Sequence, residues 1–199
     1  MRWELIDGGL LELIPGFLPS EACAAWFERV RAAVSFERRQ IRILGRAVDQ
    51  PRLSAWIGDP DAAYTYSGVR NEPLAWPDVL RELRDRVCAE VGSDFNSVLC
   101  NLYRDGRDSM GMHADAEREL GPEPVIASLS LGSTRRFQLR HRKRKDARLD
   151  LDLADGSLLI MRGTLQRHYR HGVPKQPSIE LPRINLTFRK VLVDAGSTE

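Results

Sequence analysis

The stretch RINLTFRKV, residues 183–191, alternates apolar and polar side chains in the manner of a β-strand. One face carries Ile184, Leu186 and Phe188. The opposite face carries Arg183, Asn185, Thr187 and Arg189. Two structures fit this polar face: the solvent side of an edge strand, or the interior of a barrel in which an anion neutralises the two arginines.

The sequence before this stretch changes from helical to β patterns near residue 97. Helical spacing predicts one helix over residues 20–34 and a second from about 77 to 91, and two short strands are expected at 40–45 and 46–49. The later candidate strands are 97–103, 125–131, 135–141, 149–153, 157–161, 168–172 and 183–191. This order predicts an α+β protein with a sandwich or barrel core.

Length and composition indicate one ordinary globular domain over residues 1–199, with 42% hydrophobic and 29% charged residues. No apolar run approaches the ~20 residues that a membrane-spanning helix needs. The N-terminus lacks the continuous apolar stretch of a signal peptide. The three cysteines, Cys23, Cys88 and Cys100, are widely spaced, as in reduced proteins. We therefore expect a soluble, cytoplasmic protein with no membrane contact, and a monomer.

Charge is distributed unevenly, although the net charge is only +2. Residues 135–145 read RRFQLRHRKRK and contain no acidic side chain. A run of this kind attracts polyanions such as a phosphate backbone. From charge alone, a solvated surface face is an equally good interpretation.

Three of the four histidines are relevant to a metal site. His113 and Asp115 are two residues apart, so on a strand both side chains point to the same side. With a distant histidine they form a two-histidine, one-carboxylate set, which holds non-haem iron(II) and leaves coordination positions open. We favour His171 as the third ligand over His168, which would face the other side of the predicted strand 168–172.

These motifs together resemble the AlkB family of iron- and 2-oxoglutarate-dependent dioxygenases, in the branch of the nucleic-acid repair demethylases. The pattern His-x-Asp…His is followed by a strand of the form R-x-N-x-T-x-R. The similarity runs from about residue 51 to 191. It includes PRLSAW (51–56), YTYSG (64–68), NLYRDG (101–106), HADAEREL (113–120), ASLSLGSTRRFQLR (127–140) and HGVPK (171–175).

The resemblance implies a double-stranded β-helix, or jelly roll, over residues 97–191. Residues 1–96 would supply N-terminal helices and the hairpins of a nucleotide-recognition lid. It implies iron(II) on His113, Asp115 and His171, with 2-oxoglutarate held by Arg183 and Arg189. Guanidinium groups suit this role because they bind carboxylates bidentately and stay charged when buried. The other implied cosubstrate-binding residues are Asn101, Tyr103, Asn185 and Thr187.

The same resemblance places substrate contacts before the core. Tyr64 and Tyr66 match positions where relatives put an aromatic lid over the target base, which needs stacking partners once extruded. Ile43 and Leu44, at the tip of a predicted hairpin, match a wedge that probes duplexes. The alternatives are that Tyr66 is an ordinary sheet aromatic and that the hairpin with Ile43 and Leu44 packs on its own domain.

Further predicted substrate contacts depend on charged side chains. Arg46 and Arg52 are candidate phosphate contacts, as is the basic run 135–145. Ala116 replaces an acidic residue that close relatives often carry after the iron-binding aspartate, whereas Glu117 matches the next acidic position. This departure predicts a broader or altered range of alkylated bases.

The function implied is oxidative dealkylation of N-alkylated bases in single- or double-stranded DNA, or in RNA, coupled to decarboxylation of 2-oxoglutarate to succinate. Two alternatives stand beside it. One is the same chemistry on a protein side chain, lipid or small molecule. The other is a nucleic-acid-binding jelly roll without catalytic activity.

Overall fold

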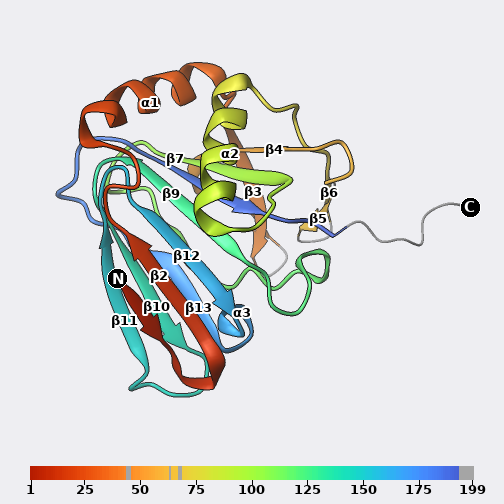
Figure 1. Ribbon diagram of the computed structural model, residues 1–199, viewed down its shortest axis with the longest axis vertical. Helices are drawn as coiled ribbons and strands as arrows, with labels where there is room; N and C mark the ends of the chain where they lie inside the picture. The colour runs from red at the N-terminus through yellow and green to blue at the C-terminus, as the bar shows by residue number, and fades with distance from the viewer. Residues whose placement is uncertain (44–45, 63, 67–68, 193–199) are drawn as a thin grey trace, which may run out of the picture.

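The computed structural model of the chain describes residues 1–43, 46–62, 64–66 and 69–192 (Figure 1). Two antiparallel sheets form its body. The larger has the order β1 (Arg2–Glu4), β2 (Gly9–Ile14), β12 (Leu158–Gly163), β9 (Ile126–Gly132), β14 (Arg183–Arg189), β7 (Ser97–Tyr103), β4 (Arg46–Gly58), β3 (Glu37–Ile43). The smaller has the order β11 (Arg148–Leu153), β10 (Arg135–His141), β13 (Tyr169–Val173), β8 (Met110–His113).

Two helices cover the outer face of the larger sheet, as Figure 1 shows for α1 (Ser20–Ala33) and α2 (Asp78–Val91). Their apolar faces, which include Trp26, Phe27 and Leu83, join one buried cluster with Leu186 and Phe188 of β14. The helices agree with the sequence prediction, because each has an uninterrupted apolar stripe. α2 ends at Gly92, which adopts the left-handed conformation (φ 66°) that glycine accommodates without strain.

A second core lies between the two sheets. It includes Phe137 and Leu139 from the smaller sheet and Leu159 and Met161 from the larger one. Strand alternation therefore sends one set of side chains to the helices and the other set to the jelly-roll interior. All residues of β14 are buried, including its four polar ones. The solvent-exposed edge-strand interpretation of this strand is therefore wrong, because β14 lies between β7 and β9.

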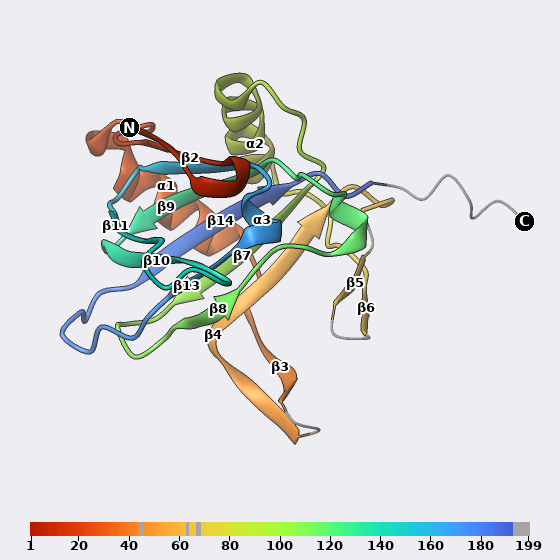
Figure 2. The same ribbon diagram turned by 90° about the horizontal axis from the view of Figure 1, so that it is seen from below.

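The β3–β4 hairpin projects beyond the body of the molecule, and the short pair β5 (Tyr64–Tyr66) and β6 (Val69–Asn71) lies beside it at the same end (Figure 2). The sequence placed strands at 40–45 and 46–49, but β4 extends to Gly58 and pairs with β7 inside the sheet. Pro51 obscured this continuity, since proline usually interrupts a strand.

Several short elements were not predicted. β1 and β2 extend the larger sheet at its N-terminal edge, although residues 2–14 gave only a mixed pattern. The expected strand 168–172 begins instead at Tyr169, because residues Leu165–His168 form the one-turn helix α3. A single turn is too short to show helical periodicity. Among the described helices, none has the length and apolar character needed to cross a membrane.

Candidate metal centre

His113 and His171 face each other across neighbouring strands. They are direct partners in the β8–β13 register, and Asp115 follows two residues after the end of β8. His113 Nε2 lies 3.6 Å from Asp115 Oδ1, and His171 Nε2 lies 4.0 Å from Asp115 Oδ2. One ligand atom from each residue falls within 4.8 Å of the others. The three predicted ligands therefore meet at one point, although Asp115 lies beyond the strand on which it was expected.

The hydrogen bonding of His113 leaves its Nε2 available. Its Nδ1 lies 2.9 Å from the carbonyl oxygen of Gly111, which only accepts hydrogen bonds. Nδ1 must therefore carry the proton, and in the neutral ring Nε2 keeps its lone pair toward Asp115. A carbonyl partner on the second nitrogen is the usual arrangement for a metal-binding histidine.

Asp115 is buried, and both its backbone and its carboxylate are held. Its N–H donates to Gln166 Oε1 (3.0 Å), and Arg189 Nη2 lies 3.0 Å from Oδ2. Burial alone would raise the pKa of this carboxyl, but Arg189 and the two imidazoles lower the pKa below its usual range. Asp115 is therefore a carboxylate throughout the physiological pH range, as a metal ligand must be.

His171 is buried, and the structure keeps it neutral. Burial, then the neighbouring His113, lowers the pKa of its imidazole to about 3. Its ring stacks on Phe137 of β10, with ring centroids 5.5 Å apart. Gly172 lets β8 approach, because a Cβ there would lie 2.8 Å from the Met110 carbonyl oxygen. A neutral, fixed imidazole at this position suits metal coordination.

A pocket beside these residues contains the buried guanidinium of Arg183. It is lined by His113, Asp115 and His171 and by inward-facing residues of β14, among them Arg183. Arg183 donates from Nη2 to Ser130 Oγ (2.8 Å), and burial lowers its pKa to about 10. Within the described part of the chain, its Nε and Nη1 have no hydrogen-bond partner. Buried donors of this kind require an anion, and a carboxylate of 2-oxoglutarate fits them.

The other predicted cosubstrate residues also lie on the inner face of β7 and β14, where Asn101 is the register partner of Asn185 and Tyr103 that of Arg183. Asn101 accepts from Arg52 Nε (2.7 Å), while in the described structure its Nδ2 has no partner. Asn185 Nδ2 donates to Ser128 Oγ (2.7 Å) and to the Leu129 carbonyl. Its amide protons are therefore already used within the protein.

Thr187 lines the pocket and also supports Asn185, because its hydroxyl donates to Asn185 Oδ1 (3.0 Å). Tyr103 lies between two guanidinium groups, with Arg135 and Arg183 each 5.3 Å from its ring centre. The aromatic ring separates these two cations while attracting both. Tyr103 thereby fixes Arg183 at the wall of the pocket.

The predicted substrate residues lie in different environments. Glu117 is half-buried, and burial together with Asp115 raises its pKa. Its Oε2 has no partner among the described residues. Arg52 is buried beside Asn101, so the structure places it inside the fold and not on a phosphate-binding surface. Leu44 lies outside the described residues, and only the backbone placement of Ile43, Tyr64 and Tyr66 is described.

The basic run 135–145 has acidic partners on the neighbouring strand and turn. Arg136 pairs with Asp152, Arg140 with Asp150, and Arg144 with Asp146. Arg135 is buried and donates to backbone carbonyls of Asp105, Asp108 and Pro174. The surface is therefore less positive than the run of letters suggests, because the acidic residues lie a few positions further along the chain.

Two residues of the site were missed at the sequence level. Gln166 contacts Asp115 and His171, and Phe137 supports the His171 ring. Gln166 gave no clear signal, because it stands in the polar and basic stretch TLQRHYRH, residues 164–171. Phe137 gave no signal, since it fits the apolar alternation of β10.

A jelly roll that brings two histidines and a carboxylate together beside a buried arginine, Arg183, with two nitrogens unpartnered among the described residues, has the fold and site of an iron- and 2-oxoglutarate-dependent oxygenase. Residues 10–189 match the family model of the 2OG-Fe(II) oxygenase superfamily. The chain belongs to this superfamily and, within it, to the AlkB family, as its relatives show.

Two curated relatives illustrate the similarity. DNA oxidative demethylase ALKBH2 of Mus musculus is 42% identical over 160 residues, covering 77% of this chain and 67% of the relative. Alpha-ketoglutarate-dependent dioxygenase alkB homolog 3 of Homo sapiens is 40% identical over 191 residues, covering 92% and 66%. The chain thus spans about two thirds of the length of these relatives.

Solved structures share the fold at lower identity. The structure of OsALKBH1 superposes with a TM-score of 0.66 at 19% identity, covering 96% of this chain and all of that one. An oxidoreductase of the 2OG-Fe(II) oxygenase family from Burkholderia pseudomallei gives 0.61 at 14% identity, covering 92% and 87%. These two likenesses support the jelly-roll architecture.

Proposed function

We propose that the protein removes alkyl groups oxidatively from N-alkylated bases in DNA or RNA. His113, Asp115 and His171 would hold iron(II), and Arg183 and Arg189 would hold 2-oxoglutarate. The observation that carries this proposal is the meeting of a two-histidine, one-carboxylate set with the unpartnered donors of Arg183 in one buried pocket. A hydrolytic metal site has no need of that second anion-binding group.

The bound iron and 2-oxoglutarate supply the oxidation, in which dioxygen is consumed, 2-oxoglutarate loses carbon dioxide to give succinate, and the alkyl group leaves as an aldehyde. The protein provides position and charge. Asp115 and the neutral His171 present ligands that need not lose a proton at neutral pH. Arg183 offers to a carboxylate its Nε and Nη1, which have no partner among the described residues, and Tyr103 keeps that guanidinium in place.

Nucleic acid is the proposed substrate because a relative in the same family is named a DNA oxidative demethylase. Glu117 supports this choice. Its Oε2 lacks a partner in the described chain and lies on the segment that follows the metal ligands. We propose that this carboxyl meets the exocyclic amine or cationic ring of the alkylated base.

The projecting hairpins β3–β4 and β5–β6 are the proposed base-recognition elements. They lie at one end of the molecule, where the β3–β4 hairpin extends past the body of the larger sheet (Figure 2). Tyr64 and Tyr66 would stack on the extruded base, and Ile43 with Leu44 would fill the gap that the base leaves. Arg52 is not proposed as a phosphate contact, because its Nε donates to Asn101 Oδ1.

The test is succinate release coupled to methyl loss from oligonucleotides carrying 1-methyladenine or 3-methylcytosine, single- and double-stranded. We expect both products in equal amounts, and neither from His171→Ala. Activity that survives this substitution would overturn the metal assignment. Succinate release without methyl loss would point to a protein side chain or small molecule as substrate, and no succinate at all would point to a binding protein.

Ala116 bears on which bases are accepted. A single acidic residue, Glu117, follows the metal-binding Asp115 within the next two positions. We propose that weaker negative charge near the base reduces the preference for cationic lesions. Ala116→Asp should then increase turnover of 1-methyladenine relative to a neutral lesion such as 1-methylguanine. An unchanged ratio would argue against this role.

The three cysteines are free thiols, which fits the reducing cytoplasm in which we propose that the protein acts. We also propose that it acts as a monomer. Size-exclusion chromatography with light scattering would test the second point directly, and a dimer mass at micromolar concentration would contradict it.

A further inference from the structure

Gln166 lies where it can fix the position of the metal-binding carboxylate. It is the second residue of α3 and is buried. Its Oε1 accepts the backbone N–H of Asp115 at 3.0 Å and lies 3.2 Å from His171 Nε2. Because a metal-binding Nε2 carries no proton, the bond to the Asp115 N–H is the one that can hold in the metal-loaded site.

The orientation of this carboxamide is determined by its surroundings. The Nε2 end of Gln166 donates to Met161 Sδ at 3.4 Å, a weak acceptor in the inter-sheet core. If the amide were reversed, its NH₂ would face the Asp115 N–H, and two donors would oppose each other. The oxygen therefore points to Asp115 and can only accept there.

Asp115 needs this support because strand pairing ends before it. The β8–β13 register is His171 with His113, after which β8 stops. Within the described residues, the Asp115 backbone N–H has Gln166 as its side-chain acceptor, 51 residues away in the chain. The hydrogen bond therefore replaces a strand contact at the residue that supplies the carboxylate.

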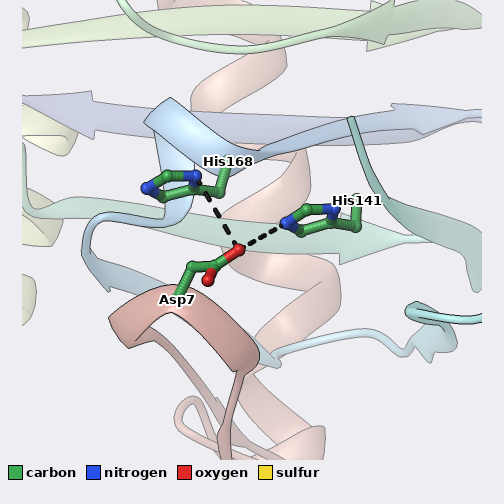
Figure 3. Close-up of side chains that lie close together, drawn as sticks. All are labelled: Asp7, His141 and His168. Atoms are coloured by element: carbon green, nitrogen blue, oxygen red, sulfur yellow. Dashed lines mark hydrogen bonds and ion pairs between the residues drawn. The ribbon is translucent and has the colours of Figure 1, made fainter. Parts of the chain in front are cut away.

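The outer side of α3 is anchored by a second group of two histidines and an aspartate (Figure 3). His141 Nε2 lies 2.8 Å from Asp7 Oδ2, and His168, the last residue of α3, has Nδ1 4.0 Å from the same oxygen. Thr164, which precedes α3, donates its hydroxyl to the Asp7 carbonyl. Asp7, in the 3-10 turn Ile6–Gly8, therefore contacts residues at both ends of α3.

This outer group does not have the protonation pattern of a metal site. His141 Nδ1 accepts the backbone N–H groups of Lys143 (3.1 Å) and Arg144 (2.9 Å), so its proton is on Nε2, which donates to Asp7. A metal on Nε2 would require the proton to move to Nδ1, where it would oppose two N–H donors. Its role is to anchor α3.

We infer that Gln166 is a positioning residue for the metal centre, which holds the Asp115 backbone from an α3 that Asp7 and His141 anchor on the outside. This inference rests on the proposed metal site. Partners that orient metal ligands usually contribute about 10- to 100-fold to metal affinity. Gln166 should therefore tune how tightly the centre binds a divalent ion without contacting 2-oxoglutarate or nucleic acid.

The test is anaerobic titration of the full chain with Co(II), followed by its d–d absorption, which reports both affinity and ligand geometry. Gln166→Leu should weaken binding at least about tenfold and change the spectrum. Gln166→Glu keeps an acceptor at the same distance and should restore both. Arg167→Leu, on the exposed neighbouring residue of α3, is the matched control and should match the wild type.

The outcomes distinguish failure of the positioning role of Gln166 from failure of the metal site itself. Equal affinity and spectrum for wild type, Gln166→Leu and Arg167→Leu would overturn the positioning role. If instead wild type and His171→Ala bound Co(II) equally, the metal site itself would be wrong. Should Gln166→Leu fail to fold by circular dichroism, Gln166→Asn retracts the carboxamide from Asp115 with its polarity kept, and it should show the same weakening.

Discussion

Two groups of identical composition lie on either side of α3. The inner group is His113, Asp115 and His171, and the outer group is Asp7, His141 and His168. In both groups, each histidine ring has a nitrogen within 4.0 Å of an aspartate oxygen. The polar atoms around the two groups differ. His113 Nδ1 faces a carbonyl, whereas His141 Nδ1 faces two N–H groups. The partner of the remote ring nitrogen decides whether a histidine can bind metal or must donate a proton.

Burial separates the two groups further. The side chain of Asp115 is 5% exposed and that of Asp7 is 50% exposed. The inner group lines a pocket that the buried Arg183 and Arg189 also line. An identical set of residue types therefore gives a candidate reaction centre in one place and a structural anchor in the other.

The largest expected difference between the groups is in activity. His113→Ala and Asp115→Ala should reduce succinate release to the level of a protein-free control, because each removes a ligand of the ion. His141→Ala and Asp7→Ala should retain activity within a factor of a few at 25 °C. The comparison would fail if an outer substitution were as damaging as an inner one in protein that circular dichroism shows to be folded.

The second effect concerns the anion pocket. Arg183→Met keeps the volume of the side chain but removes the N–H groups available to a carboxylate. Loss of a charge-assisted pair should cost about 2–3 kcal/mol, or roughly 30- to 150-fold in affinity for 2-oxoglutarate. Isothermal titration of the Mn(II)-loaded protein measures it, with the surface Arg136→Met as control. An unchanged dissociation constant would remove Arg183 from the cosubstrate site.

How far the sequence could predict this arrangement is shown by β14 and α3. The alternation of Arg183 to Arg189 was sufficient to place both arginines on one polar face, because a strand fixes which side chains share a side. The sequence could not decide whether that face was buried. The answer depends on β7 and β9 on either side, and those contacts join residues that are distant in the chain.

The sequence was sufficient to pick the candidate ligands and not the residues that support them. His113, Asp115 and His171, which the structure brings together, could be picked because metal chemistry restricts the residue types. Gln166 was missed because a one-turn helix has no periodicity and glutamine has many roles. The sequence left two interpretations of the basic run 135–145 open, since its partners Asp150 and Asp152 come into contact only when β10 and β11 pair.

The third prediction uses the pKa of His171. Its pKa falls from 6.5 to about 3 on folding, so between these values the unfolded chain binds a proton that the folded one does not. Stability is therefore complete above pH 6.5 and is lost as the pH falls toward 3, by at most about 1.4 kcal/mol per pH unit. Going from pH 6.5 to pH 5 should cost metal-free protein about 2 kcal/mol through this group.

Urea unfolding of metal-free wild type and His171→Gln at several pH values measures this contribution. Glutamine does not titrate, so the variant should lose less stability than the wild type between pH 6.5 and 5. Parallel curves would mean that His171 becomes protonated in the folded state and is not kept neutral by burial.

The smallest effect concerns the outer group. Asp7→Ala removes the acceptor of His141 Nε2 and leaves alanine in the left-handed conformation that Asp7 adopts (φ 61°). Because Asp7 is half-exposed, the loss of stability should be about 1 kcal/mol. Thermal unfolding at neutral pH measures it, with Glu28→Ala on the exposed side of α1 as control. A drop in melting temperature no larger than the control's would mean that the contact between Asp7 and His141 does not stabilise the fold.

The comparison between the two groups is tested most directly by anomalous diffraction from crystals grown with Mn(II) and 2-oxoglutarate. The account predicts one strong peak between His113, Asp115 and His171, and none between Asp7, His141 and His168. A peak at the outer group, or no peak at the inner one, would contradict it.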